Sequence, residues 1–548
     1  MKAAIGLSLL SVLLLFDISR REPSREHSTG TPPHDDYRRM LAACATVSLL
    51  VAPLGPLWNR TMDLALYQSG KVPYPSENPM RDYFSTFNLP ARLLAALFRF
   101  GASDVVIALT SSVALLFIGT FALTLIIYSP SSRPFWSAAV GSLAVLAPRQ
   151  INPSFLFLDA SAHVYPALTW TTHHTMGLYG LYLLLLVIGL EINDFRRRAV
   201  GAVVLTAAAH PVFGAFAAAF LFLNVVLSKP FVQRLSKRKT SVALLAVALI
   251  GILITSGRRS FRSDEERSLV RTFEDLWDGH RGGAEVIRVN VVASILFATS
   301  ICWLMSFLTP PASLKRRRTF RILALINGLA GVLYLAQIVN WLSDPLSFVR
   351  TYQLGRLTLL SGYLNLAFLA AYILRITHRN VKWSIPRSRT VSKISIAAVL
   401  TAITAIYAPT LMSAPTYDCP TISPNIFFGT SESSLSLYRE CRWPVALDTT
   451  GLDFVPYFPD TAPAVNELLS IGYGIGLGDL SPEFQNRGSL PDEAFRAIWE
   501  GRTRSEWMEV YESTRIRYLA APEQWKLSAE PVAAFKNYVV RDLKDSME

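Results

Sequence analysis

Long apolar runs alternate with short basic segments along most of this 548-residue chain. A helix needs about 20 apolar residues to cross the hydrocarbon core of a bilayer. Such runs predict helices at 40–58, 104–127, 134–148, 174–191, 241–256, 289–308, 320–342, 357–375 and 395–412. The pattern predicts an all-α polytopic membrane protein with about 10–12 transmembrane helices.

The two ends of the chain differ from this pattern. Residues 1–39 contain an apolar run at 2–16, short for a span, and then a polar, Pro-containing stretch. We interpret 1–39 as an N-terminal apolar anchor with a disordered linker.

The transmembrane domain is then 40–412. The hydrophilic tail 413–548 alternates short β-like runs (445–447, 517–520) with helix-like stretches (462–469, 505–513), which predicts a small α/β domain.

Basic residues orient the spans. Lys and Arg cluster at 196–198, 229–239, 315–318 and 375–393. Because such clusters are retained on the cytoplasmic side during insertion, these segments are expected inside. The outside segments are then 59–103, 149–173, 257–288, 343–356 and the extracytoplasmic tail 413–548. This topology predicts a multi-pass protein of the cytoplasmic (inner) membrane.

The apolar segment 201–227 has basic clusters on both sides, so both of its ends are expected inside. At about 1.5 Å per residue it is too short for two full spans. The pair His210-Pro211 breaks it in the middle, because proline cannot continue the helical hydrogen-bond ladder. We predict two short helices that either dip from the inside or cross a thinned region buried in protein.

Composition supports the membrane interpretation. The chain is 51% hydrophobic and 17% charged, whereas soluble proteins carry about 25% charged residues. The net charge of +13 is explained by the inside clusters. The sequence has no basic stripe with interleaved aromatic residues, so nucleic-acid binding is not predicted.

Of the four cysteines, Cys419 and Cys441 lie in the tail. An outside tail in an oxidising compartment would let them form a disulfide; two unpaired thiols are the alternative.

The first outside loop carries the preferred catalytic candidate. Asp63 follows the span ending near Trp58, so it is expected close to the outer membrane face, where a carboxylate can act as a general base. Tyr67 lies four residues on and therefore on the same helical face, as a substrate-binding candidate. The alternative is that Asp63 begins a helix and faces water. Asp82 is the competing carboxylate of this loop and a second substrate-binding candidate.

Apolar residues recur at helical spacing over 89–100, with Arg92 and Arg99 between them. This profile is typical of a helix lying in the plane of the membrane interface. It could form the floor of a cleft for a lipid substrate, or serve as structural support.

The second outside loop contains Asp159, His163, His173 and His174. Adjacent histidines point apart on a helix, so a polar, aromatic cavity wall suited to sugars is favoured over a metal site. Asp159 is the second candidate acid or base, and His163 a substrate-binding candidate. No metal ligands are assigned, and a divalent cation remains an open possibility.

Arg350 and Arg356 lie just before an apolar span. An arginine at the rim of a helix bundle suits bidentate capture of phosphate. Arg356 is the preferred phosphate ligand, and interfacial snorkelling is the alternative.

The chain resembles the GT-C superfamily of integral membrane glycosyltransferases. The resemblance lies in Asp63 with Tyr67 after an early span, the helix that follows, the 350–356 arginines and an outside C-terminal domain. Two tail passages, 507–511 (WMEVY) and 516–520 (IRYLA), look like the end domains of bacterial members. The resemblance implies a polyprenyl-phosphate-linked sugar as donor, a glycan, lipid or protein as acceptor, and Asp63 as catalytic carboxylate.

The hypothesis is therefore a membrane glycosyltransferase acting at the outer face. One alternative is a polysaccharide polymerase or ligase that relies on the arginines and histidines of the outside loops. Another is a lipid-linked glycan transporter or a non-enzymatic membrane subunit. The scarcity of ionisable residues within the spans weighs against transport.

Overall fold

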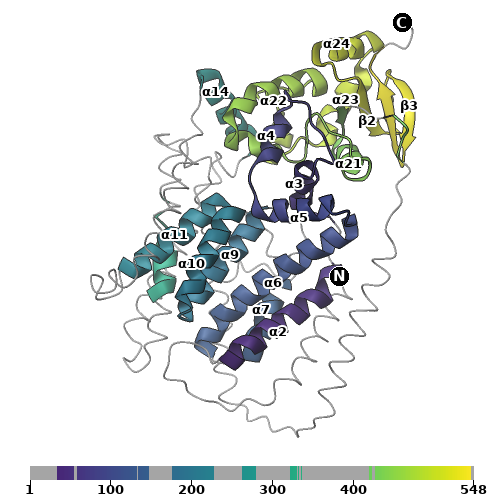
Figure 1. Cartoon of the computed structure of the whole chain (residues 1–548). Helices are drawn as coiled ribbons and strands as arrows, with labels where there is room; N and C mark the ends of the chain where they lie inside the picture. Colours follow the sequence, from purple (N-terminus) through teal and green to yellow (C-terminus); the bar gives the residue numbers. More distant parts are fainter. Residues whose placement is uncertain are drawn as a thin grey trace.

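The computed structural model describes residues 34–54, 58–131, 134–146, 176–226, 262–278, 321–329, 331–332, 335, 419–422 and 426–544. Figure 1 shows these residues in two parts: a bundle of apolar helices, and a mixed helical and stranded unit at one end of it. The spans predicted at 241–256, 289–308, 357–375 and 395–412, and the loops 149–173 and 343–356, lie outside the described residues.

The bundle consists of α2 (His34–Val51), α6 (Asp104–Ser131), α7 (Pro134–Leu146), α9 (Met176–Ile192), α10 (Arg196–Ala209) and α11 (Pro211–Val226). The helices α6, α7 and α9 coincide with apolar runs predicted as spans. Among the described helices, one segment, Asp104–Tyr128 of α6, is long and apolar enough to cross a membrane, while Gly177–Ile192 and Pro211–Asn224 are shorter apolar helices. The described part is thus mostly helical, but it does not establish the predicted number of spans.

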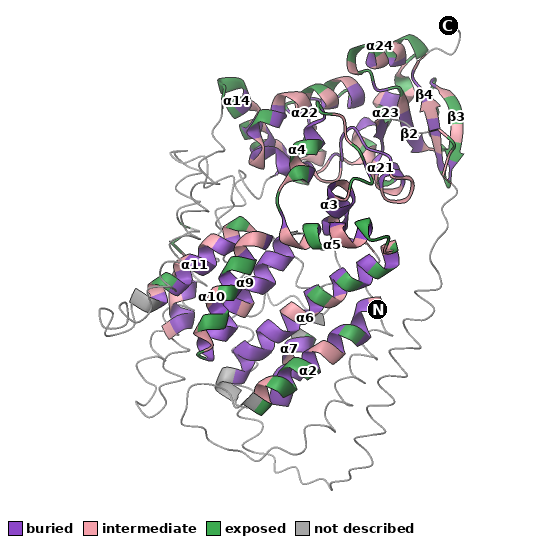
Figure 2. Ribbon diagram, in the orientation of Figure 1, coloured by how far each residue is buried: buried purple, intermediate pink, exposed green. Residues whose placement is uncertain are grey.

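Small residues let the bundle helices approach closely. A Cβ at Gly119 of α6 would lie 2.6 Å from the Tyr182 ring of α9, and one at Gly141 of α7 would lie 2.8 Å from Thr124 Oγ1 of α6. Glycines at such contacts allow backbones to pack tightly where the hydrophobic effect between helices is weak. Figure 2 shows the buried faces of these helices turned toward one another.

The helix break predicted at His210 is confirmed, since α10 ends at Ala209 and α11 begins at Pro211. Asn88, in the first loop, donates a hydrogen bond from Nδ2 to the Ala209 carbonyl at 2.6 Å. The tip of the hairpin therefore reaches the first-loop helices.

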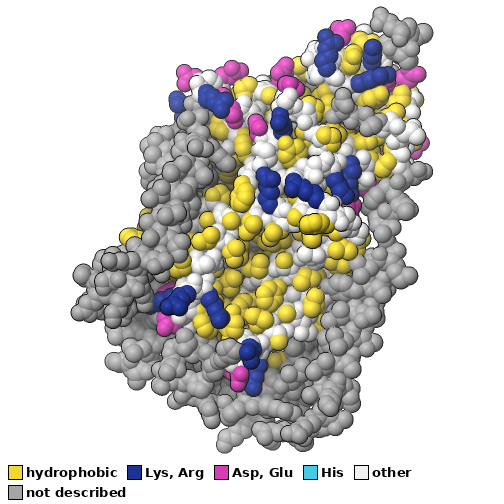
Figure 3. All heavy atoms as spheres, viewed as in Figure 1, with side chains coloured by type: hydrophobic (Ala, Val, Ile, Leu, Met, Phe, Trp, Pro, Cys, Tyr) yellow, Lys and Arg dark blue, Asp and Glu magenta, His cyan; other side chains and the backbone are white. Residues whose placement is uncertain are grey.

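The first loop folds into α3 (Arg60–Gln68), α4 (Pro79–Ser85) and α5 (Leu89–Arg99). The interfacial-type helix predicted at 89–100 corresponds to α5, which lies across the ends of the bundle helices (Figure 1). Its exposed residues include Arg92, Leu93 and Arg99, and Leu93 is 61% exposed. In Figure 3, Lys and Arg side chains line the boundary between the apolar bundle and the mixed unit.

The C-terminal unit contains a four-stranded mixed sheet in the order β1-β2-β4-β3, with β1 and β2 parallel and the other pairs antiparallel. Its strands are β1 (Phe427–Gly429), β2 (Tyr518–Pro522), β3 (Glu530–Phe535) and β4 (Tyr538–Asp542). Its helices are α21 (Ser431–Ser436), α22 (Ala462–Leu468), α23 (Asp492–Gly501) and α24 (Arg504–Thr514). Shorter 3₁₀ or π turns are η7 (Leu437–Cys441), η8 (Leu452–Tyr457), η9 (Pro459–Thr461), η10 (Leu469–Tyr473) and η11 (Pro482–Phe484), and η1 (Ala52–Leu54) follows α2.

Residues 262–278 join the same unit. They form α14 (Asp264–Thr272) and the π turn η3 (Phe273–Trp277). Trp277 is fully buried and its Nε1 donates to the Leu477 carbonyl at 2.8 Å, while the Gly488 amide donates to the Trp277 carbonyl at 2.6 Å. The first loop, 262–278 and the tail therefore lie together at one end of the bundle (Figure 1).

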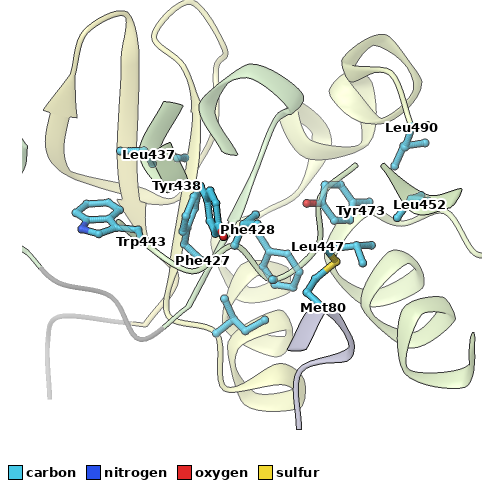
Figure 4. Packing of buried hydrophobic residues seen from close by; sticks show 14 of the residues in the cluster. Met80, Phe427, Phe428, Leu437, Tyr438, Trp443, Leu447, Leu452, Tyr473 and Leu490 are labelled. Atoms are coloured by element: carbon cyan, nitrogen blue, oxygen red, sulfur yellow. The ribbon is translucent and has the colours of Figure 1, made fainter. Parts of the chain in front are cut away.

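The first loop and the C-terminal unit share a core. Met80 of α4 is fully buried and points among side chains that include Leu447 and Tyr473 of the tail (Figure 4). The Asn78 side chain, which begins α4, also donates to the Ala446 carbonyl at 2.9 Å. Burial of apolar side chains across this contact stabilises the two segments as one body.

Candidate functional site

Asp63 lies in the first turn of α3, where the helix dipole favours a carboxylate. Asp63 is 2% exposed, so the alternative in which this residue begins a helix and faces water is wrong. Oδ1 accepts hydrogen bonds from Trp58 Nε1 at 2.5 Å and from Arg439 Nε at 2.9 Å. Oδ2 accepts one from Arg439 Nη2 at 2.9 Å. Both oxygens are therefore engaged, mainly by a bidentate arginine from the C-terminal unit.

Arg439 belongs to η7, which carries a second arginine just beyond its end. Arg442 binds both carboxylate oxygens of Asp104 at 2.7 Å, and Asp104 is the first residue of α6. The guanidinium carbons of Arg439 and Arg442 lie 5.5 and 5.8 Å from the centroid of the Trp58 ring, within cation–π range. Two arginines of one turn thus bind two carboxylates of the first loop and the span that follows it.

A disulfide fixes the end of this turn. Cys419 and Cys441 are bonded, with 5.6 Å between their Cα atoms. Cys441 lies between Arg439 and Arg442 in sequence, so the bridge restrains the segment that presents both guanidinium groups.

A third ion pair joins the two segments. Arg60, at the start of α3, donates hydrogen bonds to Asp448 and to Thr450 Oγ1, and its Nη1 is 4.0 Å from Asp63 Oδ2. Burial opposes the ionisation of Asp448, but the Arg60 guanidinium and the bonds from Thr450 outweigh it and hold the pKa of this carboxyl below its usual value. Burial likewise opposes the charge of Arg60, yet the neighbouring Asp448 and Asp63 raise its pKa.

Aromatic rings pack beside the ion pairs. The Phe84 ring stacks on Tyr438 at 5.7 Å and lies 5.9 Å from Tyr67 and 5.4 Å from Tyr74. The Tyr438 hydroxyl donates to the Asp63 carbonyl at 2.7 Å. Burial raises the pKa of both Tyr74 and Tyr438 well above the usual value, and nearby carboxylates add to this effect, so both phenols remain neutral at physiological pH.

The other predicted site residues are dispersed or undescribed. Tyr67 lies in the aromatic group and on the same helix as Asp63, whereas Asp82 is an exposed residue of α4. Asp159, His163, Arg350 and Arg356 lie outside the described residues. Among the residues that the structure describes, no group of three or more His, Cys, Asp or Glu side chains is placed to hold a metal ion.

Arg439, Arg442, Asp104 and Asp448 were not predicted. The pair Arg439 and Arg442 was detectable in the sequence, because these two arginines flank Cys441 in a stretch, 394–486, that has no other Lys or Arg. Their partners were not, because each lies more than 300 residues away: the separation is 376 residues for Arg439 with Asp63 and 338 for Arg442 with Asp104.

Comparison with known proteins gives little further guidance. No family model matches the chain, and no curated protein matches it. One solved structure, the archaeal oligosaccharyltransferase AglB from Archaeoglobus fulgidus in complex with an inhibitory peptide and a dolichol-phosphate, aligns over 95% of this chain and 69% of its own at 13% identity. The TM-score is 0.24, so this likeness carries no argument for the fold or the function.

Proposed function

We propose that this protein is a multi-pass membrane glycosyltransferase that moves a sugar from a polyprenyl-phosphate donor to a glycan, lipid or protein acceptor. Asp63 takes the proton of the acceptor hydroxyl or amine, and arginines at the membrane face stabilise the departing phosphate. The carboxylate assignment follows the resemblance to the GT-C superfamily. Arg356, which lies outside the described residues, is part of this proposal as a phosphate ligand.

The observation that carries the proposal is the placement of Asp63. It is a buried carboxylate in the first helix after an apolar bundle helix, at the junction with the C-terminal unit and beside Arg60 and Arg439. Positioned cations stabilise the negative charge that develops on a leaving phosphate, and a nearby carboxylate can accept a proton.

The membrane orientation forms part of the proposal. The basic residues at 196–198 lie at the far end of the bundle, where Arg198 stacks on Tyr37 and Phe195 at 4.6 and 5.0 Å. If that end is cytoplasmic, as basic clusters favour, the first loop and the tail are extracytoplasmic. The disulfide between Cys419 and Cys441 fits such a compartment.

The proposal is tested by transfer from a panel of polyprenyl-phosphate sugars, followed as lipid-phosphate release by purified protein in detergent. Asp63→Asn is expected to reduce release by at least about 100-fold, the usual contribution of a general base. Arg356→Ala is expected to reduce it by about tenfold or more. Glu77→Gln, at another exposed acid of the same loop, is the control and should retain wild-type release. Full activity in Asp63→Asn would refute the assignment.

One observation favours a second candidate, a non-enzymatic membrane subunit. Both oxygens of Asp63 already accept hydrogen bonds from Arg439, so in this arrangement they are engaged in a structural contact. A structural role predicts that Asp63→Asn lowers the melting temperature and that no donor in the panel is consumed by the folded wild-type protein.

A further inference from the structure

The two partners of the Asp63–Arg439 pair differ in accessibility. The side chain of Asp63 is 3% exposed and that of Arg439 is 24% exposed. Separation of a buried ion pair leaves two uncompensated charges, so each group then needs another partner of opposite charge or a hydrogen-bonding partner. An anion that approaches the pair meets the guanidinium first and can provide that substitute.

The pair also lies close to the end of the one described helix that is long and apolar enough to cross a membrane. Arg442 binds Asp104, the first residue of the membrane-length segment of α6, and its guanidinium lies 5.9 Å from the Phe98 ring of α5. The turn that carries Arg439 therefore lies at the end of the apolar bundle. If α6 crosses the bilayer, the phosphate of a membrane lipid lies beside this turn, because headgroups flank the hydrocarbon core.

Arginine binds carboxylate and phosphate in the same planar, bidentate geometry. We propose that the phosphate of the lipid-linked donor replaces Asp63 as the bidentate partner of Arg439, and that this exchange frees the Asp63 carboxylate. Donor binding would then activate the base. This inference rests on the proposed function and adds Arg439 to it as a donor-phosphate ligand.

The resulting transfer step balances. The Asp63 carboxylate accepts the proton of the acceptor hydroxyl, whose oxygen forms a bond to the anomeric carbon of the sugar. The bond between this carbon and the phosphate oxygen breaks, and its electron pair stays on the phosphate, which Arg439 holds. Before the donor arrives, Asp63 remains bound to Arg439, which limits activation of water and loss of the donor sugar.

The experiment measures binding of polyprenyl phosphate, which has no sugar to transfer, to the full-length protein in detergent. Asp63→Asn removes the group that competes for Arg439 and is expected to tighten binding about tenfold. Arg439→Ala is expected to weaken binding about tenfold, and Arg439→Lys, which keeps the charge without the planar fork, less. In the double variant Asp63→Asn/Arg439→Ala the tightening should disappear.

The double variant separates exchange from a general charge effect. If loss of a negative charge alone attracted phosphate, Asp63→Asn would tighten binding in the Arg439→Ala background as well. Glu77→Gln, at an exposed acid of the first loop, is the control and should bind as the wild type does. Unchanged or weaker binding by folded Asp63→Asn, tightening that persists in the double variant, or no binding by the wild type would each overturn the inference.

Phosphatidic acid and inorganic phosphate serve as further probes, because ordinary lipids also carry phosphate. Preference for polyprenyl phosphate over phosphatidic acid supports the donor as the exchanging ligand, and the reverse preference overturns it. Binding needs no transfer, so the two proposals can fail separately. Tightening by Asp63→Asn without transfer from any sugar donor would refute the glycosyltransferase while leaving the exchange intact.

Discussion

Three asparagines begin the helices of the first loop, and each uses both ends of its side-chain amide. The Oδ1 atoms of Asn59, Asn78 and Asn88 accept hydrogen bonds from backbone amides in the first turns of α3, α4 and α5. Their Nδ2 atoms donate to Ser111 of α6, to the Ala446 carbonyl and to the Ala209 carbonyl, respectively. One residue type thus both starts each helix and attaches it to a distant element.

We expect the two bonds of Asn78 to be separable. Asn78→Ala loses both and should lower the free energy of unfolding by about 2 kcal/mol. Asn78→Ser keeps a capping oxygen but is too short to reach Ala446, so its loss should be about 1 kcal/mol. Thermal melts of the full-length protein measure both, with Ser76→Ala, at an exposed position, as control. Melting temperatures equal to the wild type in both variants would contradict this role.

Elements set by local pattern were predicted better than elements set by long-range pairing. The apolar runs at 104–127, 134–148 and 174–191 became α6, α7 and α9, because burial of a continuous apolar surface requires no knowledge of the partner. The β-like run at 445–447 is not a strand: it forms a single bridge, from Val445 to Phe427 of the edge strand β1. Strand pairing depends on which other strands reach the sheet.

The disulfide between Cys419 and Cys441 restrains the position of η7, whose last residue is Cys441. It closes a loop with a sequence separation of 22 and is expected to stabilise the fold by about 3 kcal/mol. Reduction, or the double variant Cys419→Ser/Cys441→Ser, should lower the melting temperature by several degrees. Reductant should have no further effect on the double variant. Oxidised and reduced protein that melt together would show that the ion pairs hold η7 without the bridge.

At the scale of the whole molecule, three arginine–carboxylate pairs and a shared core join the first loop and the span after it to the C-terminal unit. Asp448 makes this junction pH-dependent. Its pKa is lowered in the folded protein, mainly because Arg60 outweighs the effect of burial. The stability it contributes is therefore present above the unfolded pKa of about 3.9 and is lost as pH falls through the folded pKa.

We expect the melting temperature to fall below about pH 4, as Asp448 takes up a proton and Arg60 loses its partner. Asp448→Asn should lower the unfolding free energy at pH 7 by about 3 kcal/mol, because a largely buried charge is left unpaired, and should show a smaller additional loss in acid. Asp82→Asn is the exposed control. An identical acid response in wild type and Asp448→Asn would place the pH-dependence elsewhere.

The sequence by itself determined the apolar helices, the break at His210 and the mixed α/β character of the tail. Each of these follows from residues close together in the chain: continuous apolar length, a proline without an amide hydrogen, and alternation of short runs. It also selected Asp63 as a carboxylate close to an apolar helix. Only the tertiary structure decided what Asp63 contacts. Arg439 and Trp58 bind it in a buried junction, and no local pattern specifies a partner 376 residues away.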